Sequence, residues 1–388
     1  MVRETFNTQK ELQYMNKKEI LEIKKLFTTD KCCIQRICGC YVDGNKNKVM
    51  TFKDAFLSLQ DEEIFKYFKL FRSTLSGTIG KNMLNMEFPL DTEAEGGTQE
   101  FLMQLRNSHL KDDDLLDFFY NKIIDNYEYG ENYLILLIDG AYDVPGKASD
   151  GLDINDASDY VYEHILCSIC PVKLSKEGLC YNAQNNTIEN RIRDWIVDAP
   201  AHGFLFPAFN DRNTDIHNIL YFSKNGEEIQ PEFIDGVLGC VTPMTGNTQK
   251  TTFHEIIEET LGDKCNFETI KTIHENLTAF VEEHKEEPEP VTFGKIELLR
   301  AIESSGVDNE CIEEFEDHFK SVTDERTNFL ASNVLNSRSF EIKAPDVTIK
   351  VAPDRTDLIE TREIDGRKYL LIELTDNVEV NGINVKPL

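Results

Sequence analysis

The chain has 388 residues, of which 40% are apolar, and its formal net charge at pH 7 is −29. Such acidity repels polyanions, and the apolar content, which includes 24 Phe and 13 Tyr, excludes a disordered acidic tail. The best apolar run, residues 133–138, is too short to span a membrane, and the polar N-terminus lacks the apolar core of a signal peptide. We therefore expect a cytoplasmic protein that makes no membrane contact.

The first part of the chain mixes helical and strand patterns after a polar extension at residues 1–14. Helices, predicted from the helical spacing of apolar residues, cover 17–26, 61–75, 98–105 and 112–124. Strands, predicted from alternation or from short apolar runs, cover 32–41, 49–52, 133–138, 160–170, 191–197, 202–209 and 216–223. A polar loop is expected around Pro145. These elements predict one α+β domain with a mixed sheet over residues 15–225.

The pattern changes after about residue 225. Residues 226–325 contain 25 acidic and 7 basic side chains, so this segment holds −18 of the net charge. Helical patterns with acidic outer faces cover 234–240, 249–261, 266–283, 295–304 and 310–319. Alternation from residue 339 onward and the turn Asp365-Gly366 predict β-hairpins. We expect an acidic helical region at 226–335 and a C-terminal β unit at 336–388, so that the whole chain is of the α+β class.

The sequence contains no complete short catalytic motif. The segment Gly77–Asn82 lacks the first glycine and the hydroxyl residue of a phosphate loop, and His254-Glu255 is not followed by the second histidine of a zinc protease helix. The sequence therefore favours a non-enzymatic binding or scaffold protein without a cofactor. The enzyme alternative is a hydrolase or nucleotide-handling fold whose carboxylates meet only in three dimensions, for instance Glu87, Asp139, Asp143 and Asp153.

Four of the ten cysteines are close together, at Cys32, Cys33, Cys38 and Cys40. Four thiols in nine residues can hold zinc or an iron–sulfur cluster. On a strand, however, Cys33 would point away from the other three, and these cysteines form no Cys-x-x-Cys pair. Buried, reduced thiols are the favoured interpretation, and a metal or redox sensor that works through Cys38 and Cys40 is the alternative.

Basic residues surround the single tryptophan, Trp195. On the predicted strand, Arg191 and Arg193 project to the same side as Trp195, and Arg212 follows after a Phe-rich stretch. Arginine can pair with phosphate, and an indole can stack on a base. We expect these four residues to form a nucleic-acid or partner binding site, unless the arginines are paired with local acids such as Asp194 and Asp198.

Five strings carry a resemblance to a known family: Met15–Ile20, Arg36–Val42, Asn85–Pro89, Cys167–Val172 and Phe204–Arg212. They resemble an uncharacterised family of gram-positive bacteria that is known only as a domain of unknown function, and the resemblance covers nearly the whole chain from Met15. It implies no activity.

The order of elements is also similar to that of the bacterial nucleoid-associated protein family, which is acidic and of about this size. This second resemblance implies a cytoplasmic binding protein without catalytic residues, whose partners are nucleic acid or nucleoid proteins. It assigns no individual residue, because architecture does not fix function.

Overall fold

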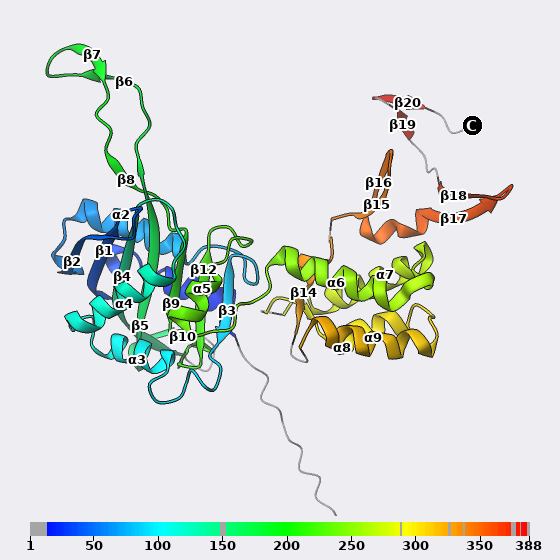
Figure 1. The fold of residues 1–388 in the computed structure, drawn as a ribbon, viewed down its shortest axis with the longest axis horizontal. Helices are drawn as coiled ribbons and strands as arrows, with labels where there is room; N and C mark the ends of the chain where they lie inside the picture. The colour runs from blue at the N-terminus through cyan, green and yellow to red at the C-terminus, as the bar shows by residue number, and fades with distance from the viewer. Residues whose placement is uncertain are drawn as a thin grey trace, which may run out of the picture. The chain divides into compact units, whose positions relative to one another are not determined.

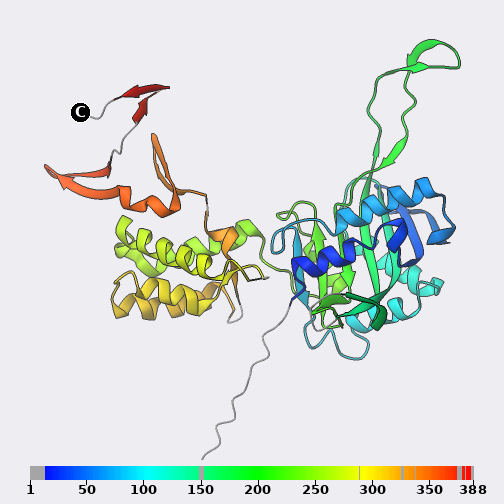
Figure 2. The ribbon, with the colours of Figure 1, turned by 180° about the vertical axis from the view of Figure 1, so that it is seen from behind.

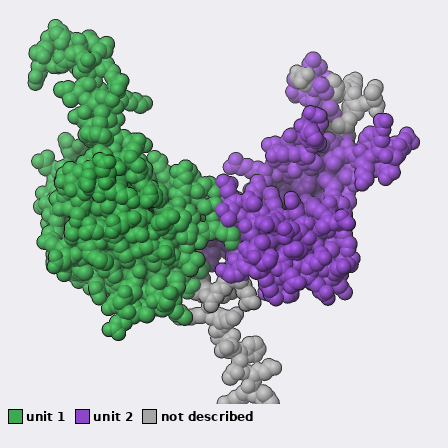
Figure 3. Space-filling model, viewed as in Figure 1, with its two compact units in different colours: residues 1–245 green, residues 246–388 purple. Residues whose placement is uncertain are grey.

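The chain divides into two compact units, residues 1–245 and 246–388 (Figure 3). The computed structural model describes residues 14–147, 153–287, 289–324, 327–336, 338–373, 378–380 and 382–385. The division lies twenty residues beyond the boundary at 225 that the charge pattern predicted. Segment 226–245 belongs to the first unit because Phe233, Ile234 and Val237 are buried in its core. Surface acidity, from which the boundary was predicted, carries no information on where these apolar side chains pack.

The first unit is built on an eight-stranded antiparallel sheet. Its strands are β1 (Ile34–Val42), β2 (Lys48–Ala55), β3 (Met83–Glu87), β4 (Tyr133–Lys147), β5 (Asp153–Leu174), β8 (Trp195–Val197), β9 (His202–Phe206) and β12 (Asn218–Ser223). The order across the sheet is β2-β1-β4-β5-β9-β12-β3, and β8 pairs with one end of β5. The two short strands β10 (Ala208–Asn210) and β11 (Asn213–Asp215) form a separate pair.

Helices cover both faces of this sheet (Figures 1 and 2). On one face lie α1 (Lys17–Lys24) and α2 (Asp61–Thr74), together with the short helix η2 (Phe56–Ser58). On the other lie α3 (Thr98–Asn107), α4 (Asp113–Asn126), α5 (Pro231–Phe233) and the π-helical turn η3 (Ile234–Leu238). The short helix η1 (Thr29–Lys31) precedes β1 and has no buried residue. Side-chain caps fix two of the helix starts, since Asn16 forms a capping box with Glu19 and Asp112 accepts from the backbone of α4.

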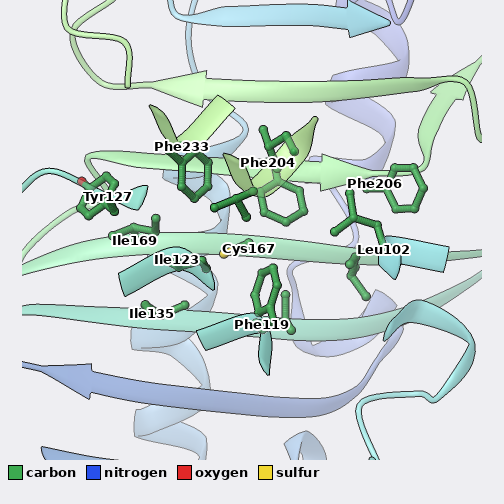
Figure 4. Packing of buried hydrophobic residues seen from close by; sticks show 14 of the residues in the cluster. Leu102, Phe119, Ile123, Tyr127, Ile135, Cys167, Ile169, Phe204, Phe206 and Phe233 are labelled. Atoms are coloured by element: carbon green, nitrogen blue, oxygen red, sulfur yellow. The ribbon is translucent and has the colours of Figure 1, made fainter. Parts of the chain in front are cut away.

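The strand alternation divides the apolar residues between two cores. In β4, Tyr133, Ile135 and Leu137 belong to the core under α3 and α4, and the intervening Leu134, Leu136 and Ile138 belong to the core under α1 and α2. Figure 4 shows the first of these cores, in which Phe119 and Ile123 of α4 face Ile135 and Cys167 of the sheet. A strand buried on both faces explains why residues 133–138 are continuously apolar.

The second unit has a helical core. Its helices are α6 (Gly246–Leu261), η4 (Gly262–Lys264), α7 (Phe267–His284), α8 (Lys295–Glu303), α9 (Asn309–Val322) and α10 (Ala331–Val334). The short strands β13 (Thr292–Phe293) and β14 (Phe329–Leu330) pair beside them. The core is formed by apolar residues of these elements, with Phe315 and Phe319 of α9 almost fully buried.

Three two-stranded hairpins follow the helices of the second unit. They are β15 (Phe340–Ala344) with β16 (Val347–Val351), β17 (Ile359–Ile364) with β18 (Arg367–Ile372), and β19 (Val378–Val380) with β20 (Ile383–Val385). Between the first two, η5 (Pro353–Leu358) places Thr356 so that its hydroxyl donates to Glu275 of α7 at 2.5 Å. The ring of Phe340 packs on His274 of α7, so the first hairpin and η5 are attached to that helix.

The α+β class predicted from the sequence is confirmed. The Asp365-Gly366 hairpin is also confirmed, since both residues have positive φ, at 52° and 74°, as a primed turn requires. The loop predicted around Pro145 is absent: β4 continues to Lys147 and accommodates Pro145 with irregular register against β5. No helix in the described part of the chain has the length and apolar character that crossing a membrane requires.

Candidate functional site

A two-stranded arm projects from the first unit between β5 and β8 (Figures 1 and 2). We call residues 175–194 the arm. Within it, β6 (Leu179–Asn182) pairs with β7 (Thr187–Asn190), and neither strand pairs with a third one in the described part of the chain. Asn182 closes the tip, because its side-chain oxygen accepts hydrogen bonds from the backbone nitrogens of Gln184 at 2.9 Å and Asn185 at 3.3 Å.

Hydrogen bonds between its two chain segments fix the arm at its base. The backbone nitrogen of Ser175 donates to the carbonyl of Asp194 at 2.8 Å, and the nitrogen of Asp194 donates to the Ser175 hydroxyl at 3.1 Å. The Arg193 guanidinium donates to the Ser175 carbonyl at 2.8 Å and to Glu177 Oε1 at 2.7 Å. The two chain segments of the arm are therefore joined by hydrogen bonds from the point at which the chain leaves β5.

The arm and its base expose apolar side chains to an unusual degree. Every residue from 183 to 198 is exposed. The large apolar side chains among the arm and β8 are exposed by 72% at Leu179, 60% at Tyr181, 65% at Ile188, 83% at Ile192, 56% at Trp195 and 49% at Ile196. In contrast, the central strands of the sheet below bury such side chains almost completely, for instance Ile135, Leu136 and Ile169.

These apolar side chains gather on one face of the β6–β7 hairpin. Residues that are directly opposite in an antiparallel pair project to the same face. Tyr181 is opposite Ile188, and Leu179 is opposite Asn190, so one face carries three apolar side chains and one amide. The other face carries Cys180 opposite Glu189 and Asn182 opposite Thr187. We call the first of these the apolar face of the arm; it contains no charged residue.

Three of the four residues predicted for binding lie at or beside the arm. The strand predicted over 191–197 is restricted to Trp195–Val197, so the strand alternation that would align Arg191 and Arg193 with Trp195 is not formed. Arg193 is engaged by Ser175 and Glu177, and neither Asp194 nor Asp198 is its ion-pair partner. Arg191 and Trp195 are both exposed.

Arg212, the fourth predicted residue, lies at the opposite end of β5. Its guanidinium pairs with Glu22 of α1 at 2.9 Å, and its carbonyl accepts from the Tyr160 hydroxyl. Tyr160 and Leu174, which pairs with Trp195, are fourteen residues apart on β5, or about 45 Å at extended spacing. The structure therefore does not bring Arg212 and Trp195 together.

The clustered thiols are divided between the two faces of the sheet. Cys38 and Cys40 are buried on the side of α3 and α4, whereas Cys32 and Cys33 precede β1 and pack against the core on the other side. Burial raises the pKa of Cys38 to about 12 and that of Cys40 to about 11, which keeps both as neutral thiols. Among the described residues, no three His, Cys, Asp or Glu side chains are grouped to hold a metal ion.

The carboxylates of the enzyme alternative are also dispersed. Glu87 ends β3, which lies four strands away from the β4 strand of Asp139 in the sheet order. Asp143 is exposed on β4, and the side chain of Asp153 lies outside the described residues. Of the three whose side chains the structure describes, Asp139 alone is buried, with 1% of its surface exposed.

Asp139 faces a histidine on a strained turn. His109 Nδ1 lies 3.4 Å from Asp139 Oδ2, which is long for a hydrogen bond, and this oxygen has no other partner among the described residues. His109 and Leu110 both have left-handed backbone angles, with φ of 49° and 54°. Burial raises the pKa of Asp139, and the nearby His109 opposes that shift. The His109 side chain is one-third exposed, so the pair is open to solvent on that side.

Sequence reasoning missed the apolar residues of the arm, namely Leu179, Tyr181, Ile188 and Ile192. A signal was present: Leu179 and Tyr181 alternate with polar residues, and the polar stretch Ala183–Asn186 before Ile188 is typical of a hairpin turn. The sequence does not show that this hairpin lacks a core beneath it. The exposure of its side chains depends on which elements lie next to β5 in the folded sheet.

The comparisons with known proteins identify the family but no activity. A search of curated proteins found no match to the chain. A family model, described as a domain of unknown function (DUF4317), matches residues 15–383. This match confirms the resemblance to a family known as a domain of unknown function. It does not test the resemblance to nucleoid-associated proteins. The chain therefore belongs to the DUF4317 family.

Proposed function

We propose that this chain is a non-enzymatic binding or scaffold protein and that its arm is the element that recognises a partner. The observation that carries the proposal is the apolar face of the arm, where Leu179, Tyr181 and Ile188 are each at least 60% exposed on a hairpin without a core beneath it. Contiguous apolar surface of this kind is typical of interaction sites. Trp and Tyr, both present here, are enriched among the residues that dominate binding energy.

The chemistry of the arm favours a protein over nucleic acid as the partner. The arm contains three basic and three acidic residues, so its net charge is zero. Nucleic-acid binding relies on an excess of Lys and Arg at the phosphates, and Arg193 already donates to Glu177. Aliphatic side chains such as Leu179 and Ile188 pack against apolar protein surface and do not stack on bases. Association with the nucleoid would, in this proposal, run through a nucleoid protein.

A co-purification experiment tests the proposal. The full chain, a variant with Leu179→Ser and Tyr181→Ser, and a control with Leu57→Ser would each be used as bait in lysate with and without nuclease. Leu57 is 68% exposed on η2 and is not part of the arm. We expect protein partners that bind the unmodified chain and the control, survive nuclease and are lost with the arm variant. Partners that disappear after nuclease would instead favour the nucleic-acid hypothesis.

The enzyme alternative retains one observation in its favour, the His109–Asp139 pair. A buried carboxyl with an unsatisfied oxygen beside a strained histidine is the kind of feature that is concentrated at active sites. If this pair transfers protons, His109→Gln and Asp139→Asn should each abolish hydrolysis of a model phosphoester or ester. Absence of turnover by the unmodified chain across such substrates would leave the binding function as the proposal.

A further inference from the structure

We propose that the arm binds the arm of a second copy of this chain, with the two apolar faces in contact. This proposal rests on the proposed function, in which the arm recognises a protein. The protein recognised is here a second copy of the chain. The surface involved is the apolar face of the arm, which carries Leu179, Tyr181 and Ile188.

The β6–β7 hairpin lacks the packing that makes such a hairpin stable. A single two-stranded hairpin is marginally stable in water, and it needs further strands or a packed face to be ordered. β6 and β7 have only each other among the described strands, and the apolar side chains on their shared face remain between 60% and 72% exposed. A second hairpin placed on this face would supply the missing layer.

The apolar face of the arm is complementary to itself. A two-fold axis brings the same patch of each copy together. An isologous contact therefore requires a patch that does not repel an identical patch. The pairs Tyr181–Ile188 and Leu179–Asn190 carry no charge, and the one ionisable carboxylate of the hairpin, Glu189, projects to the opposite face. Two copies can therefore meet here without burying like charges.

The net charge of the chain also favours contact through the arm. Because the arm is neutral, the rest of the chain carries the entire −29, and two such bodies repel each other. From Leu174 to Asn182 the arm spans eight residues, or about 25 Å at extended spacing. This exceeds the screening length of about 8 Å at physiological ionic strength. The tip of the arm thus lies beyond the screened field of the sheet from which it projects.

Mass measurement by light scattering during gel filtration tests the inference on the full chain. We expect twice the mass of the single chain at micromolar concentration. The mass should fall to that of the single chain in Ile188→Glu and in Ile188→Lys, because each substitution places like charges on facing arms. The matched control Thr187→Glu lies on the polar face of the same hairpin and should keep the double mass.

Mixing the two charged variants separates a broken contact from a misfolded arm. Ile188→Glu and Ile188→Lys copies mixed in equal amounts should recover the double mass, because opposite charges then face each other. A single-chain mass for the unmodified protein overturns this inference, while the proposed function stands if the arm variant still loses its partners in the co-purification. A double mass that persists in both variants also overturns it, because the contact between copies would lie elsewhere.

Discussion

At the scale of single residues, the interior of the first unit is distinguished by polar groups that are buried without charge. His164 is fully buried beside Gly140, where a Cβ would lie 2.6 Å from the imidazole Nε2. Burial lowers the pKa of His164 to about 4, and burial also lowers the pKa of His202, which contacts the Tyr127 hydroxyl. Both imidazoles are therefore neutral in the folded protein near pH 7.

This burial predicts a loss of stability in mild acid. The unfolded chain binds a proton at His164 below about pH 6.5, whereas the folded chain does so only near pH 4, so stability falls as the pH is lowered through this window. For His164 alone, the expected loss between pH 7 and pH 5 is about 2 kcal/mol. Thermal unfolding followed by circular dichroism should show the fall, and His164→Gln should flatten it. An unchanged pH dependence in that variant, with His217→Gln as the exposed control, would contradict the assignment.

The thiols allow a second prediction at this scale. Cys38 and Cys40 are buried with raised pKa values, whereas Cys265 is exposed. Since the thiolate is the reactive form, alkylation with iodoacetamide at neutral pH should modify Cys265 well before Cys38 and Cys40 in the folded chain. Peptide mass spectrometry reads out the order. If Cys38 or Cys40 reacts as fast as Cys265, the redox-sensor alternative gains support.

At the scale of elements, the contact of α2 with the sheet depends on one glycine. A Cβ at Gly203 of β9 would lie 2.4 Å from the Cys167 carbonyl and 2.6 Å from Thr74 Cγ2 of α2. The absence of that atom lets the Thr74 hydroxyl reach Ser168 of β5 at 2.7 Å, where both are buried. The helix is thereby anchored to the centre of the sheet by a hydrogen bond as well as by apolar packing.

Gly203→Ala should therefore destabilise the first unit. The added methyl meets backbone, which cannot move aside as a flexible side chain would, and overpacking of this kind costs about 1–3 kcal/mol. The control Gly130→Ala should be nearly neutral, because nothing lies within 4 Å of its Cβ position. Melting temperatures of the two variants make the comparison, and equal values would show that the sheet adjusts at β9.

Elements with strong local signals were predictable from the sequence, and those defined by distant partners were not. The amphipathic pattern placed α2 and α4, and the Asp-Gly turn placed β17 and β18, because these signals act within a few residues. The strand β3 was missed, since its pairing partner β12 follows it by more than a hundred residues. The candidate site could be predicted only in part. Trp195 and the two arginines lie at the arm, whereas the position of Arg212 became clear only once the course of β5 was known.

At the scale of the whole molecule, the two units have separate cores. The first unit is complete only at Thr245, because α5 and η3 fill the core next to Phe204 with Phe233 and Ile234. The helical core of the second unit is formed entirely by residues after 252. Each unit therefore has the buried surface from which a domain gains its own stability.

A chain that ends at Thr245 should fold, whereas one that ends at Ser223 should not. The shorter chain lacks Phe233, Ile234, Val237 and Leu238, all fully buried, so part of the core would face water. Circular dichroism should show a cooperative thermal transition for the longer chain alone. Cooperative unfolding of both chains would mean that this helical turn is dispensable to the core.

Salt should strengthen contact between copies if the arms join them. Screening weakens the repulsion between two chains of −29 each and leaves apolar contact intact. Sedimentation equilibrium should therefore show tighter association as NaCl is raised from low to physiological concentration and above. Nucleic-acid binding has the opposite dependence, so weaker association with added salt would contradict apolar pairing of the arms.

The position of β3 at the edge of the sheet has a consequence for synthesis on the ribosome. Its register partner for Asn85 is Leu220, which is translated 135 residues later. At 5–20 residues per second this interval is on the order of ten seconds, during which Leu84 and Met86 have no strand to pair with. The nascent chain therefore passes through a prolonged period with an open strand, in which a chaperone that shields apolar segments would raise the yield of folded protein.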